Sequence, residues 1–408
     1  MPKRAQLIVE TLSRSGYIAY YAGGYVRDFL LNLESDDVDI ATSAPPKIIQ
    51  KLFLHTVPIG LAFGIILVII DGHSYEVATF RKDLAYQDGR RPEKVAFTSE
   101  REDALRRDFT INGMFFDPLK EKLIDYVGGQ KDLKAGLIRA IGNPKERFQE
   151  DRLRMIRAVR LSNRFNFKIE AKTKAAILKQ AHTLFPSVAI ERVFQELNKM
   201  AKEVNFKRGL FLLFELKLLT TIFPALKKIT KKELEKRLFE TELIPHLAPT
   251  IAKILPIFGP LALEEKISCC QYLKLSQEDF KYVAFADLLE KKLQKASLSA
   301  SELVDLYAQK NFQIALEALA IRYPLAERKI FLARHFQNQQ KLKNFIERKK
   351  NGRPLIRAED LKNLGIQPSP LMGKLLKEAE TIAIEQNLED KEKVLFFLKQ
   401  SSFWPKLP

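Results

Sequence analysis

The sequence is poor in cysteine and histidine, and it has no long apolar run. Its 408 residues include two cysteines and five histidines. Cys269 and Cys270 are adjacent in an apolar context, which predicts buried helix thiols and excludes a disulfide framework or a zinc site. The histidines are scattered, so a histidine–aspartate metal phosphohydrolase module is not expected. Residues 65–70 form an apolar run of strand length, too short to cross a membrane.

Signals of export or repetition are also missing. The segment Met1-Pro-Lys-Arg leads directly into an amphipathic pattern, so we expect no signal peptide. No internal repeat or low-complexity segment is present. Together with the cysteine usage, these absences predict a cytoplasmic protein that does not act at a membrane.

Positive charge is what the sequence has in excess. Lys and Arg number 68 against 50 Asp and Glu, which gives a formal net charge of +18. Such an excess usually accompanies a polyanionic partner, although it can also serve solubility alone. Hydrophobic residues make up 46% of the chain, enough for substantial cores. The length predicts about two to four domains.

Two carboxylates follow a glycine pair near the start of the chain. Gly23 and Gly24 open a short predicted helix, and Asp37 and Asp39 stand one residue apart in a predicted strand. Residues i and i+2 of a strand point to one face, so the two carboxylates could together hold a divalent metal such as Mg²⁺. The glycines let backbone N–H groups approach a phosphate. Either feature alone is more often a turn or a solvated strand end; together they indicate a metal-dependent nucleoside-triphosphate site.

The order Gly-Gly-x-Val-Arg-Asp, then Asp-x-Asp-Ile-Ala-Thr, resembles the head domain of the class II tRNA nucleotidyltransferase and bacterial poly(A) polymerase superfamily. The resemblance implies an α+β fold: a polymerase-β-like nucleotidyltransferase head, with a five-stranded mixed sheet and helices, followed by an elongated all-helical neck, body and tail. It also implies that Arg27 joins the two glycines in binding the triphosphate or ribose. Glu76, on a later predicted strand, is the expected third catalytic carboxylate; the alternative is an ordinary cross-strand partner for Arg81.

The segment Leu105-Arg-Arg-Asp-Phe-Thr-Ile-Asn-Gly-Met114 resembles a second motif of the superfamily, in which the glycine is more commonly alanine. Arg106 and Arg107 offer guanidinium groups to triphosphate oxygens. Asp108 offers an acceptor, and Asn112 an amide, to a ribose hydroxyl. The exchange of alanine for glycine is one small residue for another and is expected to change nothing.

A helix predicted to begin at Arg147 carries Glu150, Asp151 and Arg154. Asp151 and Arg154 are three residues apart and so would lie one turn apart on one face. An aspartate can accept from an exocyclic amine while an arginine donates to the neighbouring ring acceptor, a pattern that cytosine and adenine share and that uracil and guanine lack. A surface salt bridge is the commoner fate of such a pair, but Glu-Asp-x-x-Arg also matches the superfamily's nucleotide-reading motif.

Two further segments belong to this resemblance. Residues 82–102 are polar and charged and predict a mobile loop, whose working residues would be Asp88, Arg90 and Arg91 and which would help to switch between C and A addition. Residues 189–199 match a Glu-Arg-x-x-x-Glu-Leu motif, which we interpret as a buttress for the nucleotide-reading helix, with contacts at i,i+4 inside its own helix.

Beyond residue 205 the pattern is helical and the motifs are sparse. Arg157 and Arg160 of the preceding neck, with Lys231 and Lys232, are the predicted RNA-binding residues, although each basic group could be only a solvated face. The predicted divisions are the catalytic nucleotidyltransferase head at 1–140, a base-recognising neck at 141–204, an RNA-binding body at 205–350 and a tRNA-binding tail at 351–408.

These observations predict a template-independent CCA-adding tRNA nucleotidyltransferase. It would transfer CMP and AMP from CTP and ATP to a tRNA 3′ end by two-metal-ion catalysis, with Asp37 and Asp39 holding two Mg²⁺ ions and pyrophosphate leaving. The partner is the tRNA acceptor arm, and no obligate protein partner is expected. Poly(A) polymerases usually carry a basic pair before a Phe where this chain has residues 60–64, Gly-Leu-Ala-Phe-Gly. An enzyme that adds A only, a poly(A) polymerase and a catalytically silent RNA-binding protein stay as alternatives.

Overall fold

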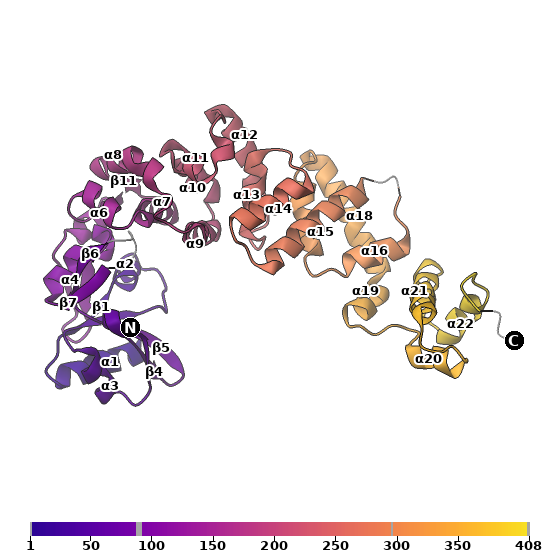
Figure 1. Cartoon of the computed structure of the whole chain (residues 1–408), viewed down its shortest axis with the longest axis horizontal. Coiled ribbons are helices and arrows are strands. Elements are labelled where there is room, and N and C mark those ends of the chain that lie inside the picture. The colour runs from indigo at the N-terminus through magenta and orange to yellow at the C-terminus, as the bar shows by residue number, and fades with distance from the viewer. Residues whose placement is uncertain (1, 87–91, 295–296, 406–408) are drawn as a thin grey trace. The chain divides into compact units, whose positions relative to one another are not determined.

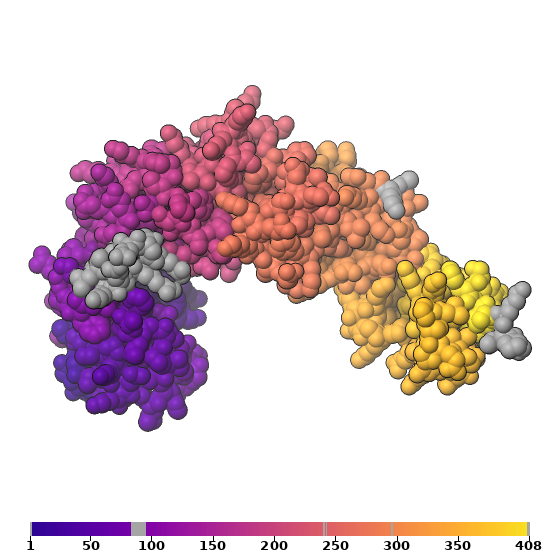
Figure 2. Space-filling view, in the orientation of Figure 1, coloured from indigo at the N-terminus to yellow at the C-terminus, as the bar shows by residue number. Residues whose placement is uncertain are grey.

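A computed structural model describes residues 2–86, 92–294 and 297–405. The chain forms two compact units, Met1–Leu234 and Glu235–Pro408. Each unit is a continuous packed body in the space-filling view (Figure 2). The predicted loop residues Asp88, Arg90 and Arg91 lie outside the described residues.

The first unit begins with a mixed sheet of seven strands, where a core of five was expected (Figure 1). In spatial order its strands are β3 (Thr56–Gly60), β4 (Ile65–Ile70), β5 (His73–Thr79), β2 (Asp39–Thr42), β1 (Ala19–Ala22), β8 (Met114–Asp117) and β9 (Lys122–Asp125). Only β2 and β5 pair in parallel; the other neighbours are antiparallel. The α+β fold class is confirmed, and β8 was hidden inside the arginine motif.

Apolar alternation explains the sheet. Ile66 and Val68 of β4 and Val77 of β5 are fully buried, while the residues between them are more exposed, as expected for period-two patterning. Asp71 and Gly72 join the two strands with positive φ values of 49° and 76°, which is the hairpin turn that an Asp-Gly pair favours.

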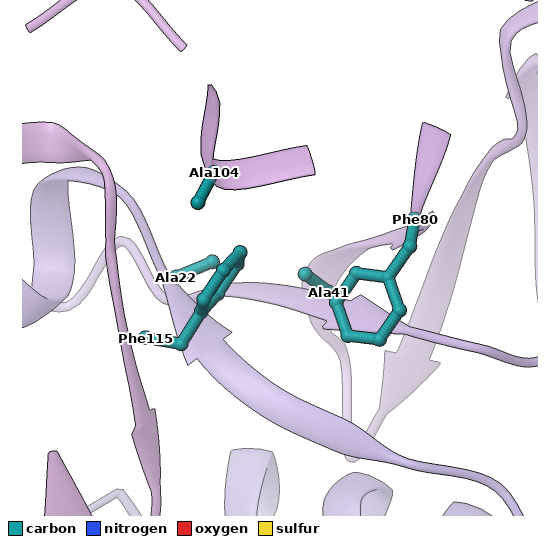
Figure 3. Close-up of a cluster of buried hydrophobic side chains, with 5 residues drawn as sticks. All are labelled: Ala22, Ala41, Phe80, Ala104 and Phe115. Atoms are coloured by element: carbon teal, nitrogen blue, oxygen red, sulfur yellow. The ribbon is translucent and has the colours of Figure 1, made fainter. Parts of the chain in front are cut away.

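A compact apolar cluster lies under the strands that carry the two sequence motifs (Figure 3). It consists of Ala22, Ala41, Phe80, Ala104 and Phe115, all buried. The rings of Phe80 and Phe115 meet edge to face with centroids 5.8 Å apart. Because Ala22 directly precedes the glycine pair and Ala104 lies in the helix before the arginine motif, this cluster fixes both motifs to one core.

The helices of the head and neck follow the chain closely. They are α1 (Lys3–Arg14), α2 (Gly24–Leu30), α3 (Pro46–Leu52), α4 (Glu100–Arg106), α5 (Gly129–Lys134), α6 (Pro144–Glu150), α7 (Leu153–Phe165), α8 (Ala171–Gln180), α9 (Ile190–Ala201), α10 (Phe206–Glu215) and α11 (Leu218–Ile222). A short parallel pair, β10 (Leu137–Ile138) and β11 (Lys168–Ile169), joins the end of the head to the neck.

Two expectations about local structure were wrong. The polar segment after β5 is mostly an antiparallel hairpin, β6 (Arg81–Tyr86) and β7 (Pro92–Phe97), followed by α4. The single helix expected from Arg147 is broken between α6 and α7, because Asp151 adopts extended backbone (φ −145°, ψ 105°) and its Oδ1 accepts from the N–H of Leu153, 3.0 Å away. An aspartate side chain competes in this way with the helical hydrogen-bond pattern.

The second unit is helical wherever the structure describes its regular elements. After α12 (Lys231–Glu242), which crosses the boundary, come α13 (Thr250–Ile254), α14 (Leu263–Tyr272), α15 (Gln277–Leu293), α16 (Ala300–Tyr307), α17 (Phe312–Ala320), α18 (Leu325–Lys341), α19 (Lys343–Lys350), α20 (Ala358–Asn363), α21 (Pro370–Glu385) and α22 (Lys391–Lys399). Cys269 and Cys270 are free thiols in α14, and burial raises their pKa values to about 12 and about 11. Among the described helices, none is long and apolar enough to cross a membrane.

Candidate active site

Asp39 opens the central strand β2 and lies between two neighbouring strands. It pairs with Ala22 of β1, and the parallel register of β2 with β5 sets it beside Glu76. Asp37 is exposed and precedes the strand, whereas Val38 and Ile40 are buried. The predicted alternation is therefore present, although the regular strand begins only at the second carboxylate.

The electrostatics of Asp39 suit a bound cation. Burial raises its pKa to about 6, the charges of Asp37 and Glu76 add to the rise, and Arg107 opposes it. Carboxylate oxygens are also the ligands that Mg²⁺ prefers. No group of three or more His, Cys, Asp and Glu side chains close enough to hold a metal occurs within the described ranges. The donor set therefore fits a metal held by two carboxylates, with water and substrate phosphate supplying the remaining ligands.

Gly23 passes between this carboxylate and an arginine. A Cβ placed on Gly23 would lie 3.1 Å from Nη1 of Arg107 and 3.5 Å from Oδ2 of Asp39. Its backbone (φ 67°, ψ −130°) is in a region that L side chains rarely adopt. The glycine is thus required by both space and conformation, and Gly24 after it is the first residue of α2.

Arg106 and Arg107 are both oriented by Asp103, a residue that sequence reasoning missed. Asp103 is 1% exposed; its Oδ1 accepts from Nε of Arg106 at 2.8 Å, and its Oδ2 accepts from Nη2 of Arg107 at 3.0 Å. Burial opposes its charge, but Arg107 and Arg106 hold the pKa of Asp103 below its usual value. The signal was available, since an acid three and four residues before an arginine pair predicts helical contacts with both.

Arg27 is held inside the protein. It is 4% exposed, and its Nε donates to Asp28 Oδ1 at 2.8 Å while Nη1 donates to Asn112 Oδ1 at 2.5 Å. Its guanidinium also lies 4.6 Å from the ring centroid of Phe165. In this arrangement Arg27 ties α2 to the arginine motif and to the neck, so its donors face protein groups.

Asp108 and Asn112 are joined to the same network. Asn112 Nδ2 donates to Asp108 Oδ1 at 3.1 Å, and Asp108 Oδ2 is 2.8 Å from Arg157 Nη2. Burial by itself would raise the pKa of Asp108, but Arg157 and the hydrogen bond from Asn112 keep it below its usual value. The two residues expected to contact a ribose are adjacent and charged as predicted.

Asp151 and Arg154 are fixed by partners at the break between α6 and α7. Asp151 Oδ2 accepts from Arg192 Nη2 at 3.2 Å. Arg154 is 8% exposed, and its Nη1 donates to Glu150 Oε2 at 2.7 Å and to the carbonyl of Arg147 at 2.9 Å. The three residues of the predicted reading motif are therefore brought together, with Glu150 holding Arg154 rather than standing free.

The α9 motif buttresses this region, but through contacts between helices. Arg192 binds Asp151, and Glu196 Oε2 accepts from Arg160 Nε at 2.5 Å. The i,i+4 contacts inside α9 were the expectation; the printed partners of these two side chains come instead from the segment they support.

Each arginine of α7 is paired with a carboxylate from a different part of the chain. The four pairs are Arg154 with Glu150, Arg157 with Asp108, Arg160 with Glu196 and Arg164 with Asp28. The expected RNA-binding residues Arg157 and Arg160 thus have protein partners. Lys231 and Lys232 are exposed in the first turn of α12, with Lys231 Nζ 5.1 Å from the ring centroid of Phe211.

Comparisons with known proteins agree with this geometry. Residues 19–139 match the family described as "Poly A polymerase head domain", and residues 166–230 match "Probable RNA and SrmB- binding site of polymerase A". A CCA-adding enzyme of Ligilactobacillus salivarius is 35% identical over 400 residues, covering 96% of this chain and 95% of its own. One of Enterococcus faecalis is 46% identical over 209 residues, 51% of each chain.

Solved structures show the same architecture. The CCA-adding enzyme of Bacillus stearothermophilus in complex with CTP superposes with a TM-score of 0.79 at 26% identity, covering 98% of both chains. That of Thermotoga maritima, complexed with tRNA_CCA, has a TM-score of 0.67 at 20% identity, covering 98% of this chain and 96% of its own, and supports the fold alone.

Proposed function

The chain belongs to the CCA-adding enzymes, a family of tRNA nucleotidyltransferases, and we propose that its residues 1–140 carry the catalysis by which CMP and AMP pass from CTP and ATP to a tRNA 3′ end. The observation that carries this proposal is the junction of Asp39, Gly23 and Arg107, where a raised carboxylate pKa, an approachable backbone and a guanidinium meet. A nucleoside triphosphate bound to divalent metal needs all three.

Asp37 and Asp39 are the residues that would hold divalent metal, and the family's nucleotidyltransferase chemistry is metal-dependent. Two bound Mg²⁺ ions would supply activation of the terminal 3′-hydroxyl and charge neutralisation on the departing pyrophosphate. Glu76, beside Asp39, adds negative charge that strengthens the attraction for a cation. These carboxylates must be ionised to act, so the site works best well above pH 6.

Triphosphate and ribose binding falls to the arginine motif. Arg106 and Arg107, pre-oriented by Asp103, present forks to phosphate oxygens, and their rigidity lowers the entropy lost on binding. Gly23 and Gly24 bring backbone N–H groups close to the same anion. Arg27 serves this site indirectly, since it holds Asn112, which holds Asp108.

Base selection is assigned to the neck, residues 141–204. Asp151 accepts from the exocyclic amine of C or A, and Arg154 donates to the adjacent ring acceptor. Glu150 and Arg192 fix the two reading groups, so their donor–acceptor order cannot adapt to U or G. The loop that includes Asp88, Arg90 and Arg91 is assigned to the change from C to A addition.

The remaining chain is assigned to RNA. Residues 205–350 and 351–408 would follow the acceptor arm by charge and shape, because duplex RNA offers little readable sequence in its deep groove. Lys231 and Lys232 are the exposed basic residues that open this region. The two free, buried cysteines favour a reducing, cytoplasmic setting.

The test is extension of three tRNA transcripts, ending before CCA, after C and after CC. Each is given CTP, ATP or both with Mg²⁺, and products are read at single-nucleotide resolution. Termination at CCA on all three supports the proposal. Addition of A only to the CC-ended tRNA would indicate an A-adding enzyme, and long A tails a poly(A) polymerase, a result disfavoured by the absence of a basic pair in residues 60–64.

A further inference from the structure

Arg147 of α6 reaches from the neck into the head. Its Nη2 donates to the backbone carbonyl of Arg107 at 2.6 Å and also to that of Arg106. These carbonyls lie at the end of α4, where acceptors lack helical partners. Arg147 is 9% exposed, so the bonds form away from bulk water and are charge-assisted. One side chain therefore grips the backbone of both predicted triphosphate-binding arginines.

The other arm of the same guanidinium faces the base-reading residues. Nη1 of Arg147 donates to Oε2 of Glu150, and that oxygen also accepts from Nη1 of Arg154 at 2.7 Å. The carbonyl of Arg147 accepts from Arg154 at 2.9 Å. A continuous path of charged hydrogen bonds thus runs from Arg154 through Glu150 and Arg147 to the arginine motif.

We propose that Arg147 is a positioning residue that sets the distance between base reading and triphosphate binding. It touches neither base nor phosphate in this arrangement; it holds the groups that do. A correct base seated against Arg154 then fixes where the α-phosphate meets Asp39, and a wrong base does not. The inference rests on the proposed function, since it assumes that Arg154 reads the base.

The planar fork explains why this position requires arginine. A guanidinium presents donors in fixed directions and can serve two carbonyls and a carboxylate at once, whereas the lysine ammonium is a single point on a flexible stem. Arg147→Lys keeps the charge near Glu150 but cannot hold all three acceptors in one geometry. It should therefore loosen the coupling while sparing most of the fold.

The experiment measures kcat and KM for ATP and for GTP on a tRNA ending in CC. Arg147→Lys, Glu150→Gln and their double variant are compared with wild type, well below each melting temperature. Arg152→Lys is the matched control, because Arg152 donates to Thr183 Oγ1 at 3.1 Å and has no printed contact with the head. We expect the ATP-to-GTP ratio of kcat/KM to fall about tenfold in Arg147→Lys, and the double variant to be no worse than the single variants.

The possible results separate positioning from mere support. If Arg147→Lys melts earlier but keeps kcat and the ATP-to-GTP ratio within about twofold of wild type, the inference is wrong. Additive losses in the double variant would also contradict it, because independent sites add. If Arg147→Lys does not fold, the ratio in Glu150→Gln decides, since that variant cuts the path beyond Arg147. Failure of wild-type protein to add A would instead overturn the proposed function.

Discussion

Gly23 and Arg107 are so close that a single methyl group would not fit between them. A Cβ on Gly23 would lie 3.1 Å from Nη1 of Arg107, and the guanidinium cannot retreat freely because Asp103 holds it. The arginine also stacks over Phe115, with its Cζ 4.9 Å from the ring centroid. The glycine backbone is therefore part of the surface that a triphosphate would meet.

We expect Gly23→Ala to reduce activity more than stability. The positive φ adds about 1–3 kcal/mol of strain, and displacement of Arg107 or Asp39 adds a catalytic loss of about 100-fold. Gly16→Ala is the matched control, since Gly16 also has positive φ but nothing within 4 Å of its Cβ position. Melting temperatures and nucleotide incorporation are measured for both. Equal activity in the two variants would remove the steric argument.

Asp39→Asn should abolish incorporation yet stabilise the metal-free protein near neutral pH. The pKa of Asp39 is raised from 3.8 to about 6, so the folded state holds a proton that the unfolded state releases, and stability falls as pH rises through that window. Removing the charge should therefore gain about 1–2 kcal/mol at pH 7.5 in EDTA and little at pH 4. Urea unfolding at the two pH values measures the difference.

Mg²⁺ supplies the complementary test of Asp39. Added Mg²⁺ should raise the melting temperature of wild type and of Asp36→Asn, whose position is exposed, but not that of Asp39→Asn. A metal response that survives in Asp39→Asn would contradict the metal assignment.

Asp103→Asn should weaken nucleoside-triphosphate binding. The amide keeps the shape of the side chain but removes the charge that faces Arg106 and Arg107 in a buried position. We expect a destabilisation of about 1–3 kcal/mol and a KM for ATP raised about tenfold. Steady-state kinetics and thermal melts are compared with Glu102→Gln, the neighbouring acid, which lies 3.8 Å from Lys82 and away from the arginine pair. An unchanged KM would show that the arginines do not depend on Asp103.

Gly113 is less interchangeable with alanine than the motif resemblance indicated. A Cβ there would lie 2.7 Å from Cγ2 of Val127 and 3.0 Å from Cδ1 of Ile141, because these side chains fill the space. We expect Gly113→Ala to destabilise the protein by about 1–3 kcal/mol. The double variant with Val127→Ala should recover part of the loss; if it loses more than the sum of both, overpacking is not the cause.

RNA binding should weaken steeply with salt. Each phosphate contact releases counterions, so replacing Lys231 and Lys232 by Ser should lower tRNA affinity and reduce the slope of log K against log salt by about one to two. Filter binding across a salt series measures the slope. A slope identical to that of wild type would show that these lysines are only solvated.

How far the sequence could be interpreted depended on whether a residue acts through its neighbours in the chain. Asp39 on a strand, the Asp71 turn and the helical second unit were predictable, because alternation and turn chemistry are local. Arg147 was not singled out, because its partners lie 40 and 41 residues earlier and no local pattern marks them. The break at Asp151 was also missed, since helical periodicity continues across it.

The same limit explains Arg27 and the α7 arginines. Sequence patterns show that a guanidinium is present but not which carboxylate reaches it. Arg27 was expected to face substrate and instead donates to Asp28 and Asn112. The formal charge of +18 likewise counts cations that the fold has already matched with acids.

The pairing of the α7 arginines constrains how this sequence can change over time. Asp28, Asp108 and Glu196 are buried, so losing one member of a pair leaves an unmatched charge at a cost of about 3–5 kcal/mol. A lineage that substitutes Arg164 must soon alter Asp28, and one that substitutes Arg160 must alter Glu196. Because the partners come from separate segments of the chain, these distant positions are expected to be inherited together, as linked characters, across the divergence of the family.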